Sequence, residues 1–235
     1  MRLRIATYNI HRGVGRDGTE NVERVAAVLR QINGDIVALQ EVSSRPAETG
    51  DVLAYLAAAA HMQPIEGFTL SAAGAHYGNA LLTTLPVSAV RRIDISVPGR
   101  EPRGVIEAIF TVDGQAIIVW ATHLGLGIRE RHLQIGKLLK IIHAADVDVR
   151  ILLGDFNEWL SWSRPLRALH RWFITSRTFA GSPATFPARK PLLRLDRIWV
   201  RPARRLVALR AHSTELSRIA SDHLPLVAEI LLDNV

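Results

Sequence analysis

Residues 151–157 are Ile-Leu-Leu-Gly-Asp-Phe-Asn, the pattern of a buried β-strand that ends in polar residues. Consecutive branched apolar residues favour a strand that is covered on both faces. Alternate residues of an extended chain point to the same side, so Asp155 and Asn157 can address one point in space. The pattern predicts either an Asx turn after the strand or a carboxylate that acts beside an amide donor.

A strand, a helix and a second strand follow one another twice in the chain. In the first unit we predict a strand over 2–9, a helix over 22–32 closed by Asn33-Gly34, and a strand over 36–39 that ends at Gln40-Glu41. In the second unit, a strand over 115–121 precedes a helix around 133–142 and the strand over 150–153. The repetition indicates two related halves of a single domain over residues 1–235.

Further strand patterns occupy residues 80–84, 87–95, 105–112, 195–200, 206–211 and 224–231. Asp113-Gly114 lies between two of these apolar segments and predicts a tight hairpin. Because strands outnumber helices, we expect an α/β fold in which two mixed β-sheets pack face to face with helices outside.

The composition limits the chemistry that this chain can perform. The chain has 235 residues, of which 48% are hydrophobic and 22% charged, so it is long and apolar enough for a sizeable core. It contains no cysteine, which excludes disulfides and thiol catalysis and leaves only oxygen and nitrogen ligands for a metal. No apolar run is long enough to span a bilayer, and no signal segment is evident, so we expect a cytoplasmic protein.

The chain is strongly basic, with a formal net charge of +7 and a pI of about 10.6. Such a charge favours polyanionic partners, either nucleic acid or an anionic membrane surface. Nearly all of the cations are arginine, however, since only Lys137, Lys140 and Lys190 are lysine. A GC-rich genome would produce the same bias, so both explanations stay open.

Polar residues collect where the predicted strands end. They are Asn9, Gln40-Glu41, His123, Asp155, Asn157, Asp196 and the run Ser221-Asp222-His223. Most of them have an ordinary alternative as turn residues, solvated strand ends or histidines with satisfied hydrogen bonds. Asp196 is harder to explain in this way, because it interrupts an apolar run and a buried acid is costly without a partner.

Together these segments resemble the endonuclease/exonuclease/phosphatase superfamily, in particular its deoxyribonuclease-like and sphingomyelinase-like branches. The motifs that carry the resemblance span the chain in the family's order: Thr-Tyr-Asn-Ile-His-Arg-Gly around Asn9, Leu-Gln-Glu-Val around Glu41, Gly-Asn-Ala-Leu-Leu around Asn79, Thr-His-Leu around His123, Gly-Asp-Phe-Asn around Asp155, Leu-Asp-Arg-Ile around Asp196, and Ser-Asp-His ending at His223. In detail the chain is similar to small bacterial members of the YbhP type. The resemblance implies a four-layer αββα sandwich with its active site at the strand ends along one edge.

The resemblance also implies hydrolysis of phosphate esters with Mg²⁺ or Mn²⁺. Glu41 and Asn9 would supply oxygen ligands to the cation, and Asp222 would add a second carboxylate at or near it. Hard divalent cations prefer such carboxylate and amide oxygens. The metal would neutralise charge on the phosphate and on the departing oxygen.

Five further residues would carry the chemistry according to the same resemblance. Asp155 would activate or orient water, and Asn157 would donate a hydrogen bond to a phosphate oxygen. His223 would face the phosphate, held in orientation by Asp196, and His123 would be a second imidazole facing the phosphate.

Two residues are candidates for substrate binding. In the related branches an arginine near Arg103 contacts the scissile phosphate; the alternative is an exposed loop arginine. Asn79 lies in a matching segment and would orient the substrate. Apurinic endonucleases of the family carry a tyrosine where this chain has His123, and this chain has no basic insertion for gripping duplex DNA, so abasic-site repair is not favoured.

Residues 159–173, from Trp159 to Phe173, are rich in tryptophan and arginine. Arg164, Arg167 and Arg171 share one face of a predicted helix, and Leu166, Leu169 and Phe173 share another. The segment is either an amphipathic helix packed on the core or an interfacial helix that contacts an anionic membrane.

We therefore predict a metal-dependent phosphodiesterase that uses in-line attack of an activated water. Its substrate would be a phospholipid headgroup or nucleic acid, with a slight preference for the membrane-presented diester and a membrane-peripheral location. The alternatives are a Mg²⁺-dependent endo- or exonuclease acting on DNA and a catalytically silent binding module on the same fold. The sequence does not define an oligomeric state.

Overall fold

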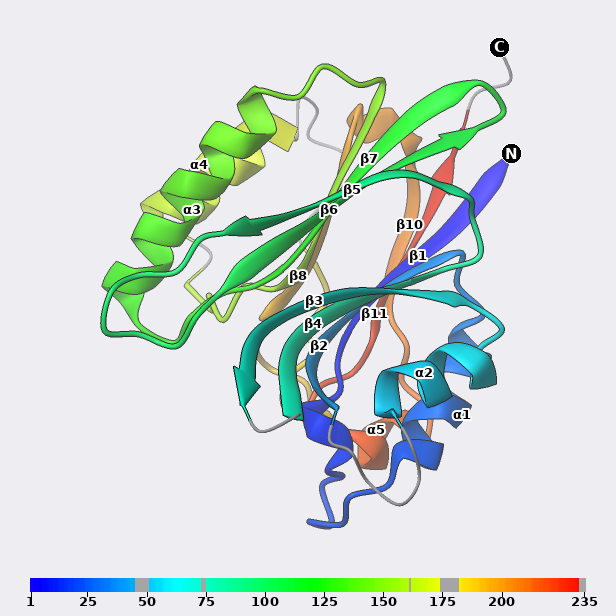
Figure 1. Cartoon of the computed structure of the whole chain (residues 1–235). Coiled ribbons are helices and arrows are strands. Elements are labelled where there is room, and N and C mark those ends of the chain that lie inside the picture. The colour runs from blue at the N-terminus through cyan, green and yellow to red at the C-terminus, as the bar shows by residue number, and fades with distance from the viewer. Residues whose placement is uncertain (45–50, 73–74, 161, 174–181, 233–235) are drawn as a thin grey trace.

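The structure is a computed structural model that describes residues 1–44, 51–72, 75–160, 162–173 and 182–232. Two β-sheets pack face to face, and helices cover the outer face of each sheet (Figure 1). The layers therefore follow in the order α, β, β, α, which confirms the predicted sandwich.

The first sheet contains six strands in the order β10-β11-β1-β2-β4-β3. Their bounds are β1 (Arg2–Asn9), β2 (Ile36–Ser44), β3 (Gln63–Ala72), β4 (Ala75–Thr83), β10 (Leu206–Ala211) and β11 (Leu226–Leu231). β1 runs parallel to β2 and antiparallel to β11, so the sheet is mixed. Its outer face is covered by α1 (Val22–Ile32), α2 (Val52–Ala59) and the short α5 (Ser217–Ala220).

The second sheet contains five strands in the order β5-β6-β7-β8-β9. Their bounds are β5 (Val87–Asp94), β6 (Gly104–Val112), β7 (Gln115–His123), β8 (Val149–Asp155) and β9 (Asp196–Arg201). β7 and β8 run parallel to each other, whereas β6 is antiparallel to β7 and β9 is antiparallel to β8. Two helices, α3 (Ile128–His143) and α4 (Arg164–Phe173), lie against the outer face.

The alternation of side chains along each strand explains the layers. In β1, Leu3 and Ile5 enter the core between the two sheets, whereas Ala6 and Tyr8 join the cluster beneath α1. The hairpin between β6 and β7 turns at Asp113-Gly114, where both residues have positive φ, as the predicted turn requires.

The structure departs from the predicted elements in two places. β2 does not end at Glu41 but continues to Ser44 through an irregularity in its pairing with β4. Helix α2 and strand β3 carry no predicted counterpart, because α2 is nearly uniformly apolar and β3 is an edge strand of mixed composition. The short 3-10 turns η1 (His11–Gly13) and η2 (Ala203–Arg205) complete the elements described. No helix in the described ranges is long and apolar enough to cross a membrane.

Candidate active site

The polar strand ends converge because of how the strands pair. β7 and β8 are parallel and in register at their ends, so His123 pairs with Asp155. β9 runs antiparallel to β8 and begins at Asp196, which pairs with Asp155 from the other side. In the first sheet, the parallel register pairs Asn9 with Gln40. Strand pairing therefore aligns the predicted residues of three strands in one sheet and two strands in the other, and the hydrogen bond from Asn9 to Asp155 joins the two groups at one edge of the sandwich.

Asp155 lies at the centre of this edge, and Gly154 makes its position possible. Gly154 has a φ of 148°, and a Cβ at this position would collide with the carbonyl oxygen of Thr122 on β7. Asp155 is 1% exposed. Its Oδ2 accepts a hydrogen bond of 3.0 Å from Asn9 Nδ2, and its Oδ1 accepts one of 2.8 Å from the backbone of Asn157. The carboxylate is thus buried, oriented and hydrogen-bonded.

Glu41 reaches the same place through a β-bulge. The register between β2 and β4 shifts between Leu39 and Val42, and Glu41 adopts a φ of 57°. A positive φ is costly for a residue with a side chain, and such strain is often retained at functional sites. Here it directs Oε1 of the partly exposed carboxylate to 3.0 Å from Asn9 Nδ2. Asn9 therefore joins the carboxylates of Glu41 and Asp155.

His223 lies between two carboxylates. Its Nδ1 is 2.8 Å from Asp196 Oδ2, the contact that the sequence analysis expected, and its Nε2 is 3.7 Å from Asp155 Oδ2. Burial alone would lower the pKa of His223, but Asp196 and Asp155 outweigh it and raise the pKa to about 10. Thr185 Oγ1 donates a 2.6 Å hydrogen bond to the same Asp196 oxygen. His223 is therefore an imidazolium at neutral pH.

His123, in contrast to His223, is neutral at pH 7. Burial lowers its pKa to about 4; Asp155 acts in the other direction, and the nearby cations Arg103 and His223 add to the lowering. Asn157 Nδ2 donates to the Leu124 carbonyl at 2.8 Å, which fixes its amide orientation, and the same nitrogen lies 3.0 Å from His123 Nε2. His123 Nε2 is thus an acceptor at neutral pH.

This arrangement differs from the predicted role of Asn157. Its side-chain nitrogen is engaged by Leu124 and His123, so in this structure Asn157 positions His123. One carboxylate, Asp155, therefore lies within 4 Å of a neutral imidazole at 3.6 Å and a charged one at 3.7 Å. Neighbouring groups whose pKa values are driven apart in this way are typical of acid–base and electrostatic catalysis.

Arg103 is buried at the border of this group. It is 7% exposed, so the alternative of an exposed loop arginine is wrong. Its Nη1 lies 3.0 Å from Glu101 Oε1 and 3.5 Å from His123 Nδ1, and its Nε has no partner in the described residues. Asn79 Nδ2 donates to the Gly104 carbonyl at 3.5 Å, beside Arg103 in the sequence. Both candidate substrate-binding residues therefore lie close to the site.

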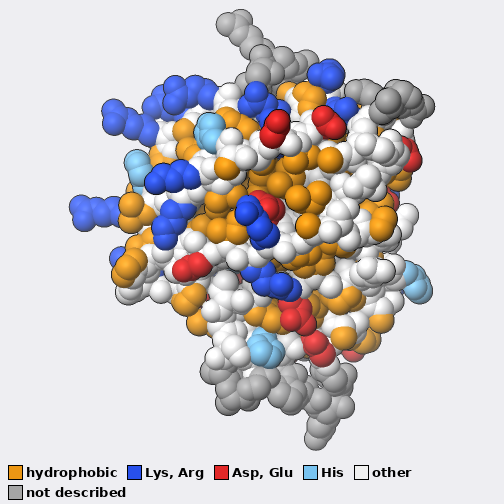
Figure 2. Space-filling view, turned by 45° about the horizontal axis from the view of Figure 1, so that its top comes forward, with side chains coloured by type: hydrophobic (Ala, Val, Ile, Leu, Met, Phe, Trp, Pro, Cys, Tyr) orange, Lys and Arg blue, Asp and Glu red, His pale blue; other side chains and the backbone are white. Residues whose placement is uncertain are grey.

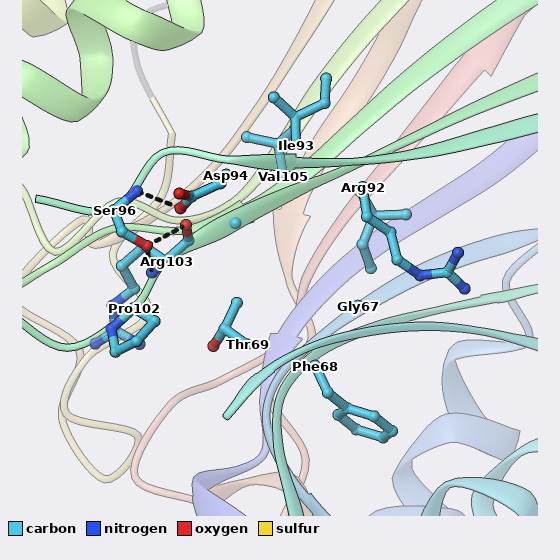
Figure 3. A pocket seen from close by; sticks show the side chains of 12 residues that line it. Gly67, Phe68, Thr69, Arg92, Ile93, Asp94, Ser96, Pro102, Arg103 and Val105 are labelled. Carbon is cyan, nitrogen blue, oxygen red and sulfur yellow. Dashed lines mark hydrogen bonds between the residues drawn. The ribbon is translucent and has the colours of Figure 1, made fainter. Parts of the chain in front are cut away.

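A cavity opens next to Arg103, between the edge strand β3 of one sheet and strands β5 and β6 of the other. Its volume is about 440 Å³. Figure 3 shows that Arg103 and Pro102 border it from the loop before β6, and Thr69 and Phe68 from β3. The cavity gives the group a space in which a substrate substituent can lie.

Two sets of residues could hold a metal ion. Asp155, Asp196 and His223 offer ligand atoms that all lie within 4.8 Å of one another. A metal-binding histidine must be neutral, however, and His223 is held as a cation by its two carboxylates. Glu41 and Asp155 both direct oxygens at Asn9 Nδ2, and Glu41 is partly exposed. Their hard oxygen donors fit Mg²⁺ or Mn²⁺ better.

Asn9 and Asp222, the other two predicted metal ligands, are oriented differently from Glu41. Asn9 turns its nitrogen, not its oxygen, to the carboxylates, because Oδ1 accepts a hydrogen bond of 3.0 Å from the backbone of His11. In this orientation it holds Glu41 and Asp155 rather than serving as an oxygen ligand. Asp222 is partly exposed, with Oδ1 3.9 Å from His11 Nδ1, and its assignment as a ligand stays a prediction.

Three residues that contact the site belong to no motif that singles them out in the sequence. Glu101 pairs with Arg103, and Thr185 binds Asp196; both lie in loops outside the motifs. Phe186 also packs its ring against His223, with centroids 4.9 Å apart. The sequence Ala-Thr-Phe-Pro offers no local signal for these contacts, since the loop reaches Asp196 and His223 only in the folded chain.

Similar proteins agree with this fold. A model of the Endonuclease/Exonuclease/phosphatase family matches residues 6–223. The uncharacterised protein YbhP of Escherichia coli K12 is 33% identical over 248 residues, which cover 98% of this chain and 96% of YbhP.

Solved structures show the same sandwich. An endonuclease/exonuclease/phosphatase from Beutenbergia cavernae is 25% identical with a TM-score of 0.77, over 98% of this chain and 72% of that one. A functionally unknown conserved protein from Enterococcus faecalis is 23% identical with a TM-score of 0.79, over 98% of this chain and all of that one. Because the family model spans most of the chain and YbhP matches it nearly from end to end, this chain belongs to the endonuclease/exonuclease/phosphatase family.

Proposed function

We propose that this protein is a divalent-metal-dependent phosphodiesterase. One observation carries the proposal: the buried carboxylate of Asp155 lies 3.6 Å from a neutral imidazole and 3.7 Å from a charged one, and Asn9 links it to Glu41. Membership of a family named for nucleases and phosphatases supports hydrolysis of a phosphate ester.

The residues of the site divide the chemistry among them. Asp155 orients a water molecule and accepts its proton as the water oxygen attacks phosphorus. The ester P–O bond in line with the attacking oxygen breaks, and the departing oxygen takes up a proton from solvent. The His223 imidazolium, held by Asp196, stabilises negative charge that grows on the phosphate oxygens. Arg103 binds the phosphate from the other side, next to His123. Asn157 and Asn9 keep their neighbours in place through short hydrogen bonds.

Glu41 is the residue that we expect to hold the metal, with Asp155 on the opposite side of Asn9. A bound Mg²⁺ or Mn²⁺ would supply positive charge for the phosphate and the departing oxygen. The side chains of the site do not supply enough positive charge by themselves. The carboxylates of Glu41, Asp155 and Asp196 outnumber the His223 cation, and the charge of Arg103 is balanced by Glu101.

The space beside Arg103 favours a diester over a monoester. The cavity beside Arg103 offers space for one of the two substituents that a diester carries. We propose a phospholipid diester as the substrate, with nucleic acid as the alternative.

The test is a substrate panel assayed with EDTA, Mg²⁺ or Mn²⁺. It compares bis-p-nitrophenyl phosphate, p-nitrophenyl phosphate, single- and double-stranded DNA, and phospholipid vesicles. We expect metal-dependent release of p-nitrophenol from the diester, faster than from the monoester.

The matched control is Asp155→Asn, which keeps the shape of the site but removes the base. It should lower kcat on the order of a thousandfold while substrate still binds. Parent activity that does not depend on metal, or an Asp155→Asn variant that keeps more than about a tenth of kcat, would contradict the mechanism.

A further inference from the structure

Four large apolar side chains are exposed just after the strand ends that carry His123 and Asp155, at the edge of the sandwich that we call the catalytic edge. Leu126 and Ile128 follow His123 and are 77% and 65% exposed; Trp159 and Trp162 follow Asn157 and are 54% and 68% exposed. We call these four residues the apolar rim. Single exposed apolar residues are common, but a group of four beside one site indicates an interaction surface.

The two loops of the rim are fixed to each other. Arg131 Nη1 donates to the Leu126 carbonyl at 2.5 Å, and its Nε lies 3.4 Å from Glu158 Oε2. The Glu158 carbonyl in turn accepts from Arg197 on β9 at 3.3 Å. Arg131 and Glu158 are almost fully buried. Buried hydrogen bonds therefore hold the two segments together at Leu126 and Glu158, next to the apolar rim.

Basic residues extend from the rim along the outer helices. The exposed cations of α3 and α4 are Arg129, Lys137, Lys140, Arg164, Arg167 and Arg171. Glu130 is the only acidic residue in these two helices, and it is buried against the Gln134 side chain. Helix α1 on the opposite face, by contrast, carries exposed Glu23 as well as Arg30. Figure 2 shows Lys and Arg side chains gathered at this side of the molecule.

Three of these cations form a row on α4. Arg164, Arg167 and Arg171 line a hollow of about 490 Å³ together with His170. None of the three has a carboxylate partner among the residues that the structure describes. The opposite face of α4 explains why the row points outward, since Leu166, Leu169 and Phe173 are fully buried. The structure thus confirms the amphipathic helix packed on the core, and contact of its arginines with a membrane stays a prediction.

We propose that the apolar rim and the basic face of α3 and α4 dock on an anionic phospholipid bilayer and bring the catalytic edge to the headgroups. Indole rings settle at the headgroup level, and arginines bind anionic lipid phosphates. This deepens the proposed function, because it names the surface on which the substrate is presented.

The aliphatic members of the rim distinguish lipid from nucleic acid. Single-stranded nucleic acid binds aromatic rings by stacking and arginines by charge, but it makes no comparable contact with exposed leucine and isoleucine. A bilayer interface accommodates both the aromatic and the aliphatic side chains. A second copy of the chain fits poorly, because two basic faces would repel each other.

The test measures binding without catalysis. The full chain is floated in EDTA with vesicles of phosphatidylcholine alone or mixed with phosphatidylglycerol, at low and high salt. We expect flotation only with the anionic vesicles, weakened by salt. Leu126→Ser combined with Ile128→Ser should lower the partition coefficient about tenfold or more. Arg167→Gln and Arg171→Gln should each lower it about fivefold.

Matched controls come from other faces of the molecule. Val207→Ser removes a half-exposed apolar residue from β10, and Arg30→Gln removes an exposed cation from α1; both should float like the parent. Gel shifts with single-stranded DNA are run at the same salt. All variants should hydrolyse soluble bis-p-nitrophenyl phosphate at the parental rate, since none alters the catalytic edge.

Each result decides one point. Failure to float with anionic vesicles, equal losses in the control variants, or tighter binding to single-stranded DNA that is lost in the rim variants would overturn the docking proposal. A protein that floats as expected but hydrolyses no diester would leave the docking surface standing and refute the proposed function instead.

Discussion

Replacing Asp196 and His223 with alanine, singly and together, tests the most specific contact in the site. Asp196 Oδ2 and His223 Nδ1 are 2.8 Å apart, and their side chains are 0% and 6% exposed. We expect each single variant to lose most of the activity and much of the stability. The double variant should lose clearly less than the sum of the two single losses, because the two side chains act as a unit.

The magnitude follows from burial. Removing one partner of a buried ion pair costs roughly 3–5 kcal/mol, because the other charge stays buried without compensation. Removing both eliminates that uncompensated charge, so the two losses should fall short of additivity by about 2–3 kcal/mol. The loss in Asp196→Ala should be the smaller one, since Asp155 at 3.7 Å still faces the imidazolium.

The assay is urea unfolding of the four proteins, with kcat/KM on bis-p-nitrophenyl phosphate measured in parallel. Asp196→Asn repeats the cycle with less lost volume in case the alanine variant does not fold. The matched control is the pair Asp17 and Arg24, which is as close, at 2.7 Å, but partly exposed. Its cycle should be nearly additive. Additive losses for Asp196 and His223 would show that the pair is not a unit and would refute the reasoning.

Three further outcomes are expected. Glu41→Gln should abolish Mg²⁺ binding in calorimetry and leave the circular dichroism spectrum unchanged; parental affinity would remove Glu41 from the ligands. Gly154→Ala should lower the free energy of unfolding by more than about 3 kcal/mol in urea titrations, because the new Cβ meets backbone, whereas Gly136→Ala, in open space on α3, should raise it by about 0.5–1 kcal/mol. Stability should also fall as pH drops from about 6.5 to 4, since burial lowers the folded-state pKa of His170 to about 4 while the unfolded chain takes up the proton near 6.5; His170→Gln should reduce that fall in pH-dependent unfolding curves, and an unchanged fall would assign it to other groups.

Most strands could be predicted because their apolar runs are long and their ends are marked by polar pairs. β1, β7 and β8 end at or within two residues of the predicted positions. The order of strands within each sheet could not be predicted in the same way. It depends on pairings between distant segments, such as β1 with β11, which leave no local pattern.

Part of the candidate site can be predicted because polar residues mark the ends of the apolar runs. Asp155 and Asp196 stood out by interrupting or ending apolar runs, and pairing in register then placed them beside each other. The orientation of Asn9 and Asn157 was not predictable, because it depends on which backbone group takes the amide oxygen or nitrogen. The bulge that aims Glu41 was also invisible, since it arises from a register shift against β4.

The tryptophans of residues 159–173 show the limit of composition. The sequence pattern treats all three alike, but only Trp159 and Trp162 are exposed. Trp172 is instead partly buried, and the guanidinium carbon of Arg201 lies 4.6 Å from the centre of the Trp172 ring. Tertiary packing separates residues that a helical pattern treats alike.

The position of β11 has a consequence for how the molecule forms. This strand lies inside the first sheet, between β10 and β1, and is joined to β1 across more than two hundred residues of chain. Contacts between such distant segments are slow to form, because a long loop must close first. His223 lies just before this strand, so the catalytic edge can be completed only when β11 has taken its place. Shortened chains and early folding intermediates should therefore lack the proposed phosphodiesterase activity, which would be confined to the finished fold.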